Sequence, residues 1–86
     1  GEMSNAMANM MLEMSSKMQI IAITHLPQVA AKGDYQLKVY KHNNLSSTST
    51  MVKKLSNKER IDEIAKMLAG DLMSDSAILH AKELLN

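Results

Sequence analysis

The sequence contains no cysteine, phenylalanine or tryptophan. The absence of cysteine excludes a disulfide framework, a thiol nucleophile and a thiolate metal site, and it fits a reducing compartment. Aromatic residues make up only 2 % of the 86 residues, so the core has to be built from Ile, Leu, Val, Ala and the 9 methionines. Because Met side chains pack adaptably, part of this apolar surface suits contact with a partner.

Charge excess and long apolar runs are also missing. The net charge is only +1, so no strong overall field directs the chain to nucleic acid or to anionic lipid. No apolar run approaches the ~20 residues that a membrane-spanning helix needs, and no signal-peptide pattern is present. A chain of this length is one small domain or one piece of a larger one, and we treat residues 1–86 as a single region.

The first third of the chain predicts a helix, a buried strand and a second, short helix. Residues 2–14 predict the first helix, whose methionines recur at helical spacing: Met3, Met7, Met10 and Met14. Packing in the core explains this face most simply, and in a piece of a larger domain part of it can be exposed. The apolar run QIIAIT at 19–24 is typical of a strand buried on both faces of a parallel sheet. Pro27 suits the first turn of a helix PQVAAK, which Gly33 would end.

The remaining residues predict an antiparallel hairpin and two C-terminal helices. Residues 35–40 alternate between apolar and polar, which predicts a strand with one solvent-facing side. A turn-rich stretch follows, and residues 48–55 predict the second strand of a hairpin. We expect this hairpin to extend the parallel sheet. Ser56 and Glu59 form a capping box for a helix that ends at Gly70. Ser74 or Asp75 can cap the last helix. The apolar positions of these two helices are Ile61, Ile64, Ala65, Leu68, Ala77, Ile78, Ala81, Leu84 and Leu85.

A histidine stands where the apolar run 19–24 ends. Thr24 and His25 come directly at its end, and Pro27 lies two residues after the histidine. A histidine in such a loop is most often an ordinary packed or solvent-facing residue. In open α/β sheets, however, ligands bind at the carboxyl ends of the strands, where a histidine can donate a hydrogen bond to a phosphate or orient a water. Position alone leaves both interpretations open.

The string around this histidine is similar to that of a known family. IAITHLPQVAAKGD resembles the switch-histidine region of the RecN family, in which an apolar strand ends in Thr-His-Leu-Pro-Gln-[Val/Ile]-Ala, as at residues 24–30 here. RIDEIAKMLAGD followed by SAILHAKELL resembles the closing helices of the same family, at the expected distance. The resemblance covers essentially the whole chain, and the THLPQVA string is fairly specific among ABC-type ATPases.

RecN proteins are bacterial ATPases of DNA double-strand-break repair and recombination, related to the structural-maintenance-of-chromosomes proteins. The resemblance implies that residues 1–86 are the C-terminal part of an α/β, P-loop ATPase head of the ABC type. It implies that His25 is a catalytic residue that binds ATP beside the γ-phosphate, with Thr24 and Gln28 near the nucleotide. Leu26 and Pro27 would shape the loop.

The resemblance also implies cofactors and partners. The implied cofactors are ATP and Mg²⁺ in the full-length parent. The implied partners are the remainder of the head, the second head of a homodimer, and DNA, with no membrane partner. The implied location is the nucleoid in the bacterial cytoplasm. The chain itself has no G-x-x-x-x-G-K-[ST] phosphate loop, no apolar strand ending in Asp-Glu and no LSGGQ-like signature. We therefore expect the isolated chain neither to bind nor to hydrolyse ATP, because phosphate binding needs loop amides, lysine and metal together.

An alternative from a different class is a free-standing interaction module that binds protein or DNA through the Met-rich helix or the hairpin and has no nucleotide role. The hairpin lysines can form a basic patch, although a solvated face explains them more simply. No second ligand lies four residues from His42 or His80, so a zinc site is not expected and no metal ligand is assigned. The run SSTST at 46–50 fits a polar strand edge better than a phosphorylation site.

Overall fold

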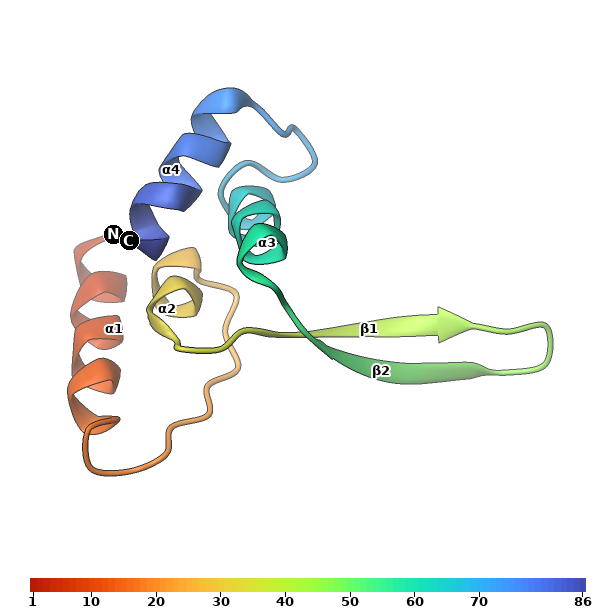
Figure 1. Cartoon of the computed structure of the whole chain (residues 1–86), viewed down its shortest axis with the longest axis horizontal. Helices are drawn as coiled ribbons and strands as arrows, with labels where there is room; N and C mark the ends of the chain where they lie inside the picture. The colour runs from red at the N-terminus through yellow and green to blue at the C-terminus, as the bar shows by residue number, and fades with distance from the viewer.

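The computed structural model describes residues 1 to 86. Figure 1 shows helices gathered at one end of the molecule and a hairpin that projects away from them, with the two termini close together. In chain order the elements are α1 (Glu2–Met14), α2 (Pro27–Lys32), β1 (Leu37–Asn43), β2 (Thr48–Lys54), α3 (Asn57–Ala69) and α4 (Asp75–Leu85). The predicted mixture of helices and strands is confirmed. None of the helices combines the length and the apolar character needed to cross a membrane.

The core lies between α2, α3 and α4, and α1 packs on the other side of α2. Alanine dominates the core, so the helices approach one another closely; Ile64 is its one large, fully buried side chain. The buried cluster consists of Ala31, Ile64, Ala65, Ala77 and Ala81. Every predicted apolar position of α3 and α4 belongs to this cluster or packs against it. The periodicity of the two C-terminal helices therefore identified their buried faces correctly.

The predicted helix ends are confirmed by local hydrogen bonds. The Ser56 hydroxyl accepts a hydrogen bond from the Glu59 backbone N–H, and the Glu59 carboxylate accepts one from the Ser56 N–H. Gly70, at the end of α3, has φ +67°, a conformation that favours glycine because it has no Cβ. Ser74, one of the two caps considered, accepts from the Ala77 N–H at the start of α4.

The predicted buried strand at 19–24 is wrong for this chain. These residues run in an irregular segment between α1 and α2, and Ile21 and Ile23 are 81 % and 103 % exposed. A strand buried on both faces needs neighbouring strands for its N–H and C=O groups. The only sheet in the chain has two strands, β1 and β2, which pair with each other, so the segment has no partner strand. The composition indicated a buried strand, but residues 1–86 do not contain the neighbouring strands that it would need.

Helix α1 forms where the methionine spacing predicts it, but the methionine face is not the one that packs. Met3, Met7, Met10 and Met14 are all exposed, and Ala8 is the only buried residue of the helix. Ala8 lies on the side that contacts α2, with the partly buried Ser4 and Met11 beside it. A small side chain allows α2 to approach closely, whereas a row of methionines would hold it farther away. This row does not pack in the core formed by residues 1–86; it is exposed, as was expected of part of it in a piece of a larger domain.

The hairpin is confirmed, but it stands apart from any larger sheet. Its register pairs Leu37 with Lys54 and Asn43 with Thr48, and the N–H of Asn44 donates to the carbonyl of Ser47 across the turn. Lys38 is the only partly buried residue of its two strands, and the others are exposed. The predictions of one buried side and of a sheet extended by the hairpin are wrong here, because α3 contacts one side only at the base of the hairpin, nothing covers the other side, and no third strand is present.

Candidate functional site

His25 lies in a bend immediately before α2, and its side chain is exposed. The Thr24 hydroxyl accepts a hydrogen bond from the backbone N–H of Leu26 at 3.0 Å, which closes a tight turn around the histidine. Leu26 has extended backbone angles, φ −97° and ψ 119°, as expected before a proline, and Pro27 occupies the first turn of α2. The imidazole is thus carried on a short turn that a hydroxyl–amide hydrogen bond closes and that leads directly into α2.

Helix α2 is the support for this turn, and Arg60 of α3 holds its far end. The Arg60 Nη2 donates to the carbonyl oxygens of Ala30, Ala31 and Gly33 at 3.2, 3.4 and 2.9 Å. These carbonyls lie at the C-terminus of α2, where a cation also meets the negative end of the helix dipole. Partial burial lowers the pKa of Arg60, and nearby Asp34 opposes that shift. Arg60 therefore fixes α2 and, through α2, the turn that carries His25.

The two other predicted site residues face different surroundings. Thr24 supports the turn through its hydroxyl, as described above. Gln28 lies in α2 and lines a groove between α1, α2 and the end of α4. The other side chains of this groove are Asn5, Asn9, Lys32, Glu83, Leu84 and Asn86. The structure thus keeps Thr24 and His25 together in one turn and places Gln28 among amide side chains of α1.

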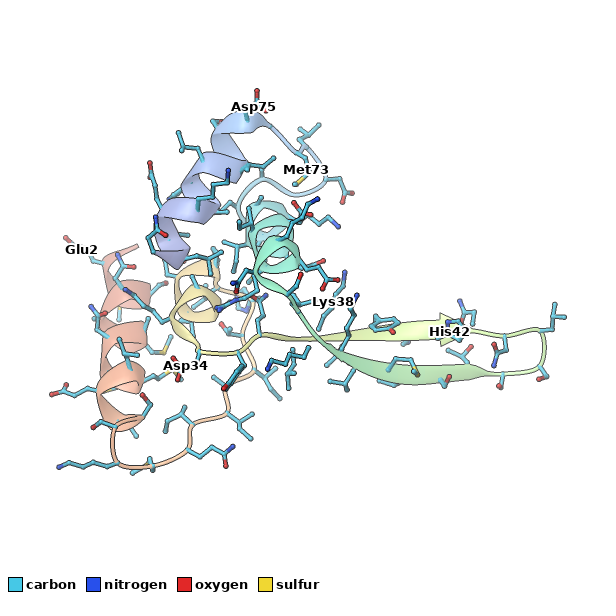
Figure 2. The ribbon with its side chains drawn as sticks, in the orientation of Figure 1. Glu2, Asp34, Lys38, His42, Met73 and Asp75 are labelled. Carbon is cyan, nitrogen blue, oxygen red and sulfur yellow. The ribbon has the colours of Figure 1, made fainter.

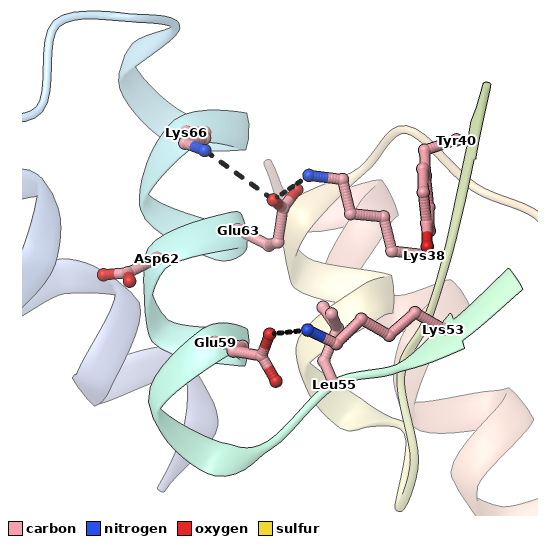
Figure 3. Close-up of a pocket in the computed structure, with 8 residues that line it drawn as sticks. All are labelled: Lys38, Tyr40, Lys53, Leu55, Glu59, Asp62, Glu63 and Lys66. Carbon is pink, nitrogen blue, oxygen red and sulfur yellow. Dashed lines mark hydrogen bonds and ion pairs between the residues drawn. The ribbon is translucent and has the colours of Figure 1, made fainter. Parts of the chain in front are cut away.

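A second cluster of charged groups joins the base of the hairpin to α3 (Figure 3). Lys38 Nζ lies 2.5 Å from Glu63 Oε1, and Lys53 Nζ lies 2.5 Å from Glu59 Oε2. Lys66 also approaches Glu63, at 3.8 Å. Hydrogen bonds from Lys53 and Ser56 lower the pKa of Glu59 from its ordinary 4.5 to about 2. The same bond to Glu59 raises the pKa of Lys53. These pairs orient the hairpin relative to the helices.

The remaining histidines lie elsewhere. His42 is near the outer end of the hairpin, as Figure 2 shows, and His80 is on α4. No group of three or more His, Asp or Glu side chains is placed to hold a metal ion. His25 is therefore the histidine that combines an exposed imidazole with a turn closed by a side-chain hydrogen bond and followed directly by a helix.

The chain is similar to several bacterial proteins named DNA repair protein RecN. It is 42 % identical over 85 residues to the protein from Bacillus subtilis, 51 % over 67 residues to that from Streptomyces coelicolor, and 35 % over 85 residues to that from Vibrio cholerae. These matches cover 99 %, 78 % and 99 % of the chain. The chain belongs to the RecN family. It corresponds to a C-terminal segment of a RecN protein and spans only 15 %, 12 % and 15 % of these relatives' lengths. No family model matches it.

The RecN relationship confirms the family that the THLPQVA string and the two C-terminal helices indicated. The sequence pattern also included Arg60 and Glu63, but their roles were not foreseen. Arg60 binds the end of α2, and Glu63 binds Lys38 of the hairpin, so both residues connect α3 to the segments before it. Spacing within one helix does not reveal such contacts, because their partners lie 25 to 30 residues away in the sequence.

Proposed function

We propose that the chain is the C-terminal part of an ATPase head that acts in DNA double-strand-break repair and recombination. The observation that carries the proposal is the similarity to proteins named DNA repair protein RecN over nearly the whole chain. The rest of the head supplies the phosphate loop and the Mg²⁺ ligands, and two heads come together around ATP. No magnesium ligand is assigned to residues 1–86.

Within this head, His25 is the residue that contacts the γ-phosphate of ATP. Its exposed imidazole and the turn fixed by Thr24 and Pro27 support this assignment, because a donor has to be held in place to favour a transition state. A ring N–H donates one hydrogen bond to a phosphate oxygen. If that bond is stronger in the transition state than in the ground state, it raises turnover more than affinity. Thr24 then acts as a positioning residue, since its hydroxyl is engaged with the Leu26 N–H.

Gln28 has a different role in this proposal. It belongs to the same string as His25 but lines the groove beside α1. Its amide can contact the nucleotide only if the rest of the head brings the nucleotide to that groove. We therefore keep Gln28 as a nucleotide-binding candidate that depends on the assembled head, and His25 as the candidate for catalysis.

The test is His25→Ala in a full-length RecN protein that carries this segment. We expect ATP affinity to stay within several-fold, while steady-state hydrolysis falls about 10²–10³-fold, the usual effect of losing one such donor. His25→Gln, which keeps a hydrogen-bond donor, should recover part of the loss. His42→Ala is the matched control, because His42 is also exposed but lies on the hairpin. Near-normal turnover of His25→Ala would make His25 an ordinary loop histidine.

A further inference from the structure

The charges of this chain are separated between the hairpin and the helices. Between Tyr35 and Leu55 there are four lysines and no Asp or Glu, although the whole chain has 10 basic and 9 acidic residues. The hairpin segment therefore carries a charge of +4, and the other residues carry six basic against nine acidic groups, or −3. Such asymmetry within a nearly neutral chain is typical of a segment that meets a polyanion.

The register divides the four lysines between two faces of the hairpin. Lys38 and Lys53 are cross-strand partners on the face toward α3, where Glu63 and Glu59 neutralise them (Figure 3). Lys41 and Lys54 lie on the opposite face, because side chains alternate along a strand. Neither takes part in the ion pairs of the structure. We call this side the outer face. It presents two lysines without a carboxylate partner.

Lys54 is held in place although it has no acidic partner. Its Nζ lies 4.1 Å from the centre of the Tyr35 ring, a cation–π contact that fixes the side chain and leaves its charge intact. Lys41 is opposite Thr50, four residues farther along the ribbon than the Leu37–Lys54 pair. At a strand rise of 3.3 Å per residue, the two ammonium-bearing positions are about 13 Å apart along the ribbon. That spacing is close to the ~12 Å width of the DNA major groove, which admits a two-stranded ribbon.

The outer end of the hairpin adds neutral donors. Five consecutive residues, 46–50, carry hydroxyl groups, and Asn43 and Asn44 precede them. All of these residues are exposed. Hydroxyl and amide groups supply many of the phosphate contacts in protein–DNA complexes, beside those of Lys and Arg. A run of such residues without a single carboxylate suits a surface that lies against a phosphate backbone.

We propose that the hairpin binds double-stranded DNA, with Lys41, Lys54 and the polar outer end against the phosphates that border a groove. This inference rests on the proposed function, since it assigns a DNA-contacting element to a repair protein. The ion pairs of Lys38 and Lys53 hold the ribbon to α3, so DNA contact would be transmitted to the helix whose Arg60 fixes α2. The contact reads no base sequence through the lysines, because phosphate contacts position the protein without specifying bases.

The apolar residues of the outer face provide the competing explanation. Leu37, beside Lys54, and the pair Val39 and Val52, between the two lysines, are exposed there, and a protein surface could cover them. DNA is favoured because lysines border this patch and no acidic residue lies on the hairpin. The substitution Val52→Lys distinguishes the DNA contact from the protein contact. The substitution adds a cation for phosphate but places a charge in an apolar contact.

The experiment measures binding of a fluorescently labelled, mixed-sequence duplex to a full-length RecN protein that carries this segment, over a range of salt concentrations. Lys41→Gln combined with Lys54→Gln should lower the slope of log affinity against log salt by about two. It should also weaken binding about tenfold or more at ~0.1 M salt. Val52→Lys should raise the slope by about one. Lys17→Gln with Lys82→Gln, the same charge change on exposed lysines of the helical part, should alter neither quantity.

ATP hydrolysis without DNA, measured on the same variants, separates this inference from the proposed function. The lysine pair lies on the hairpin, whereas His25 lies in the turn before α2, so DNA-free turnover should be unchanged. An unchanged salt slope in a protein that hydrolyses ATP overturns the hairpin proposal and leaves the ATPase proposal standing. Weaker DNA binding by Val52→Lys overturns it in favour of an apolar protein contact. Absence of ATP hydrolysis in the unsubstituted protein contradicts the proposed function, whatever the hairpin does.

Discussion

Arg60 shows how much one side chain contributes to the placement of the candidate site. Its guanidinium reaches three backbone carbonyls at the end of α2, and its Nε donates to Gln36 Oε1 at 3.3 Å. A planar, forked donor fits several acceptors at once, which a lysine ammonium does not reproduce in the same geometry. The six residues of α2 are too few to be stable alone, so this anchor and the core contacts have to hold the helix.

We therefore predict that Arg60→Ala destabilises the chain by about 2 kcal/mol, the typical loss for hydrogen bonds to a charged group. Arg60→Lys should recover only part of this loss, because it keeps the charge but not the fork. Urea unfolding followed by circular dichroism measures the change in free energy. Lys58→Ala, an exposed residue in the first turn of the same helix, is the control. A stability loss no larger than that of the control would show that α2 does not depend on Arg60.

Glu59 makes the stability of the chain depend on pH. Its pKa falls from 4.5 to about 2 in the folded chain, so the unfolded chain binds more protons between these values. The stabilisation by Glu59 is therefore complete above about pH 4.5 and is lost as the pH falls toward 2. Glu59→Gln should lower the melting temperature at pH 7 and have little effect near pH 2. An equal decrease at both pH values would exclude the charge of Glu59 as the cause.

At the scale of elements, the sequence predicted best where the signal and its partner are close together. The Ser56–Glu59 capping box and the hairpin turn depend on residues a few positions apart and were predicted correctly, and Ser74 was one of the two caps considered for α4. The segment 19–24 failed because a strand depends on neighbours that the local sequence does not contain. The prediction that His25 lies in a loop was correct for a similar reason. Pro27 ends any preceding element, whether or not that element is a strand.

The irregular segment 19–24 leads to a prediction about the full-length protein. Ile21 and Ile23 are exposed here, yet the composition of the segment suits a strand covered on both faces. We expect the backbone amides of 19–24 to exchange rapidly with deuterium in the 86-residue chain and markedly more slowly in a full-length RecN protein. The amides of Ile64 and Ala65 in the core should be protected in both. Equally fast exchange of 19–24 in the full-length protein would show that the segment is irregular in its own right.

The whole molecule exposes more surface than its mass predicts. Its accessible area is 6777 Å² at 9.5 kDa, whereas a compact monomer of that mass exposes about 5,000 Å². Its radius of gyration is 14.4 Å, against about 12 Å for a compact chain of the same length. Only 8 of the 86 residues are buried, so the core is small for the number of apolar residues in the chain. The excess lies in the projecting hairpin, the methionines of α1 and the segment 19–24.

This excess surface predicts that the isolated chain self-associates. Small cores rarely supply more than about 3–5 kcal/mol, and unpaired strand edges recruit other chains. Sedimentation equilibrium should show dimers or larger species, and Ile21→Asp with Ile23→Asp should shift them toward monomer by placing charges on the exposed apolar segment. Leu45→Asp, at the fully exposed hairpin turn, should have a smaller effect because a single residue offers little area. A monomer with a high melting temperature would mean that the small core suffices without a partner, and would contradict the prediction that the exposed apolar surface drives association.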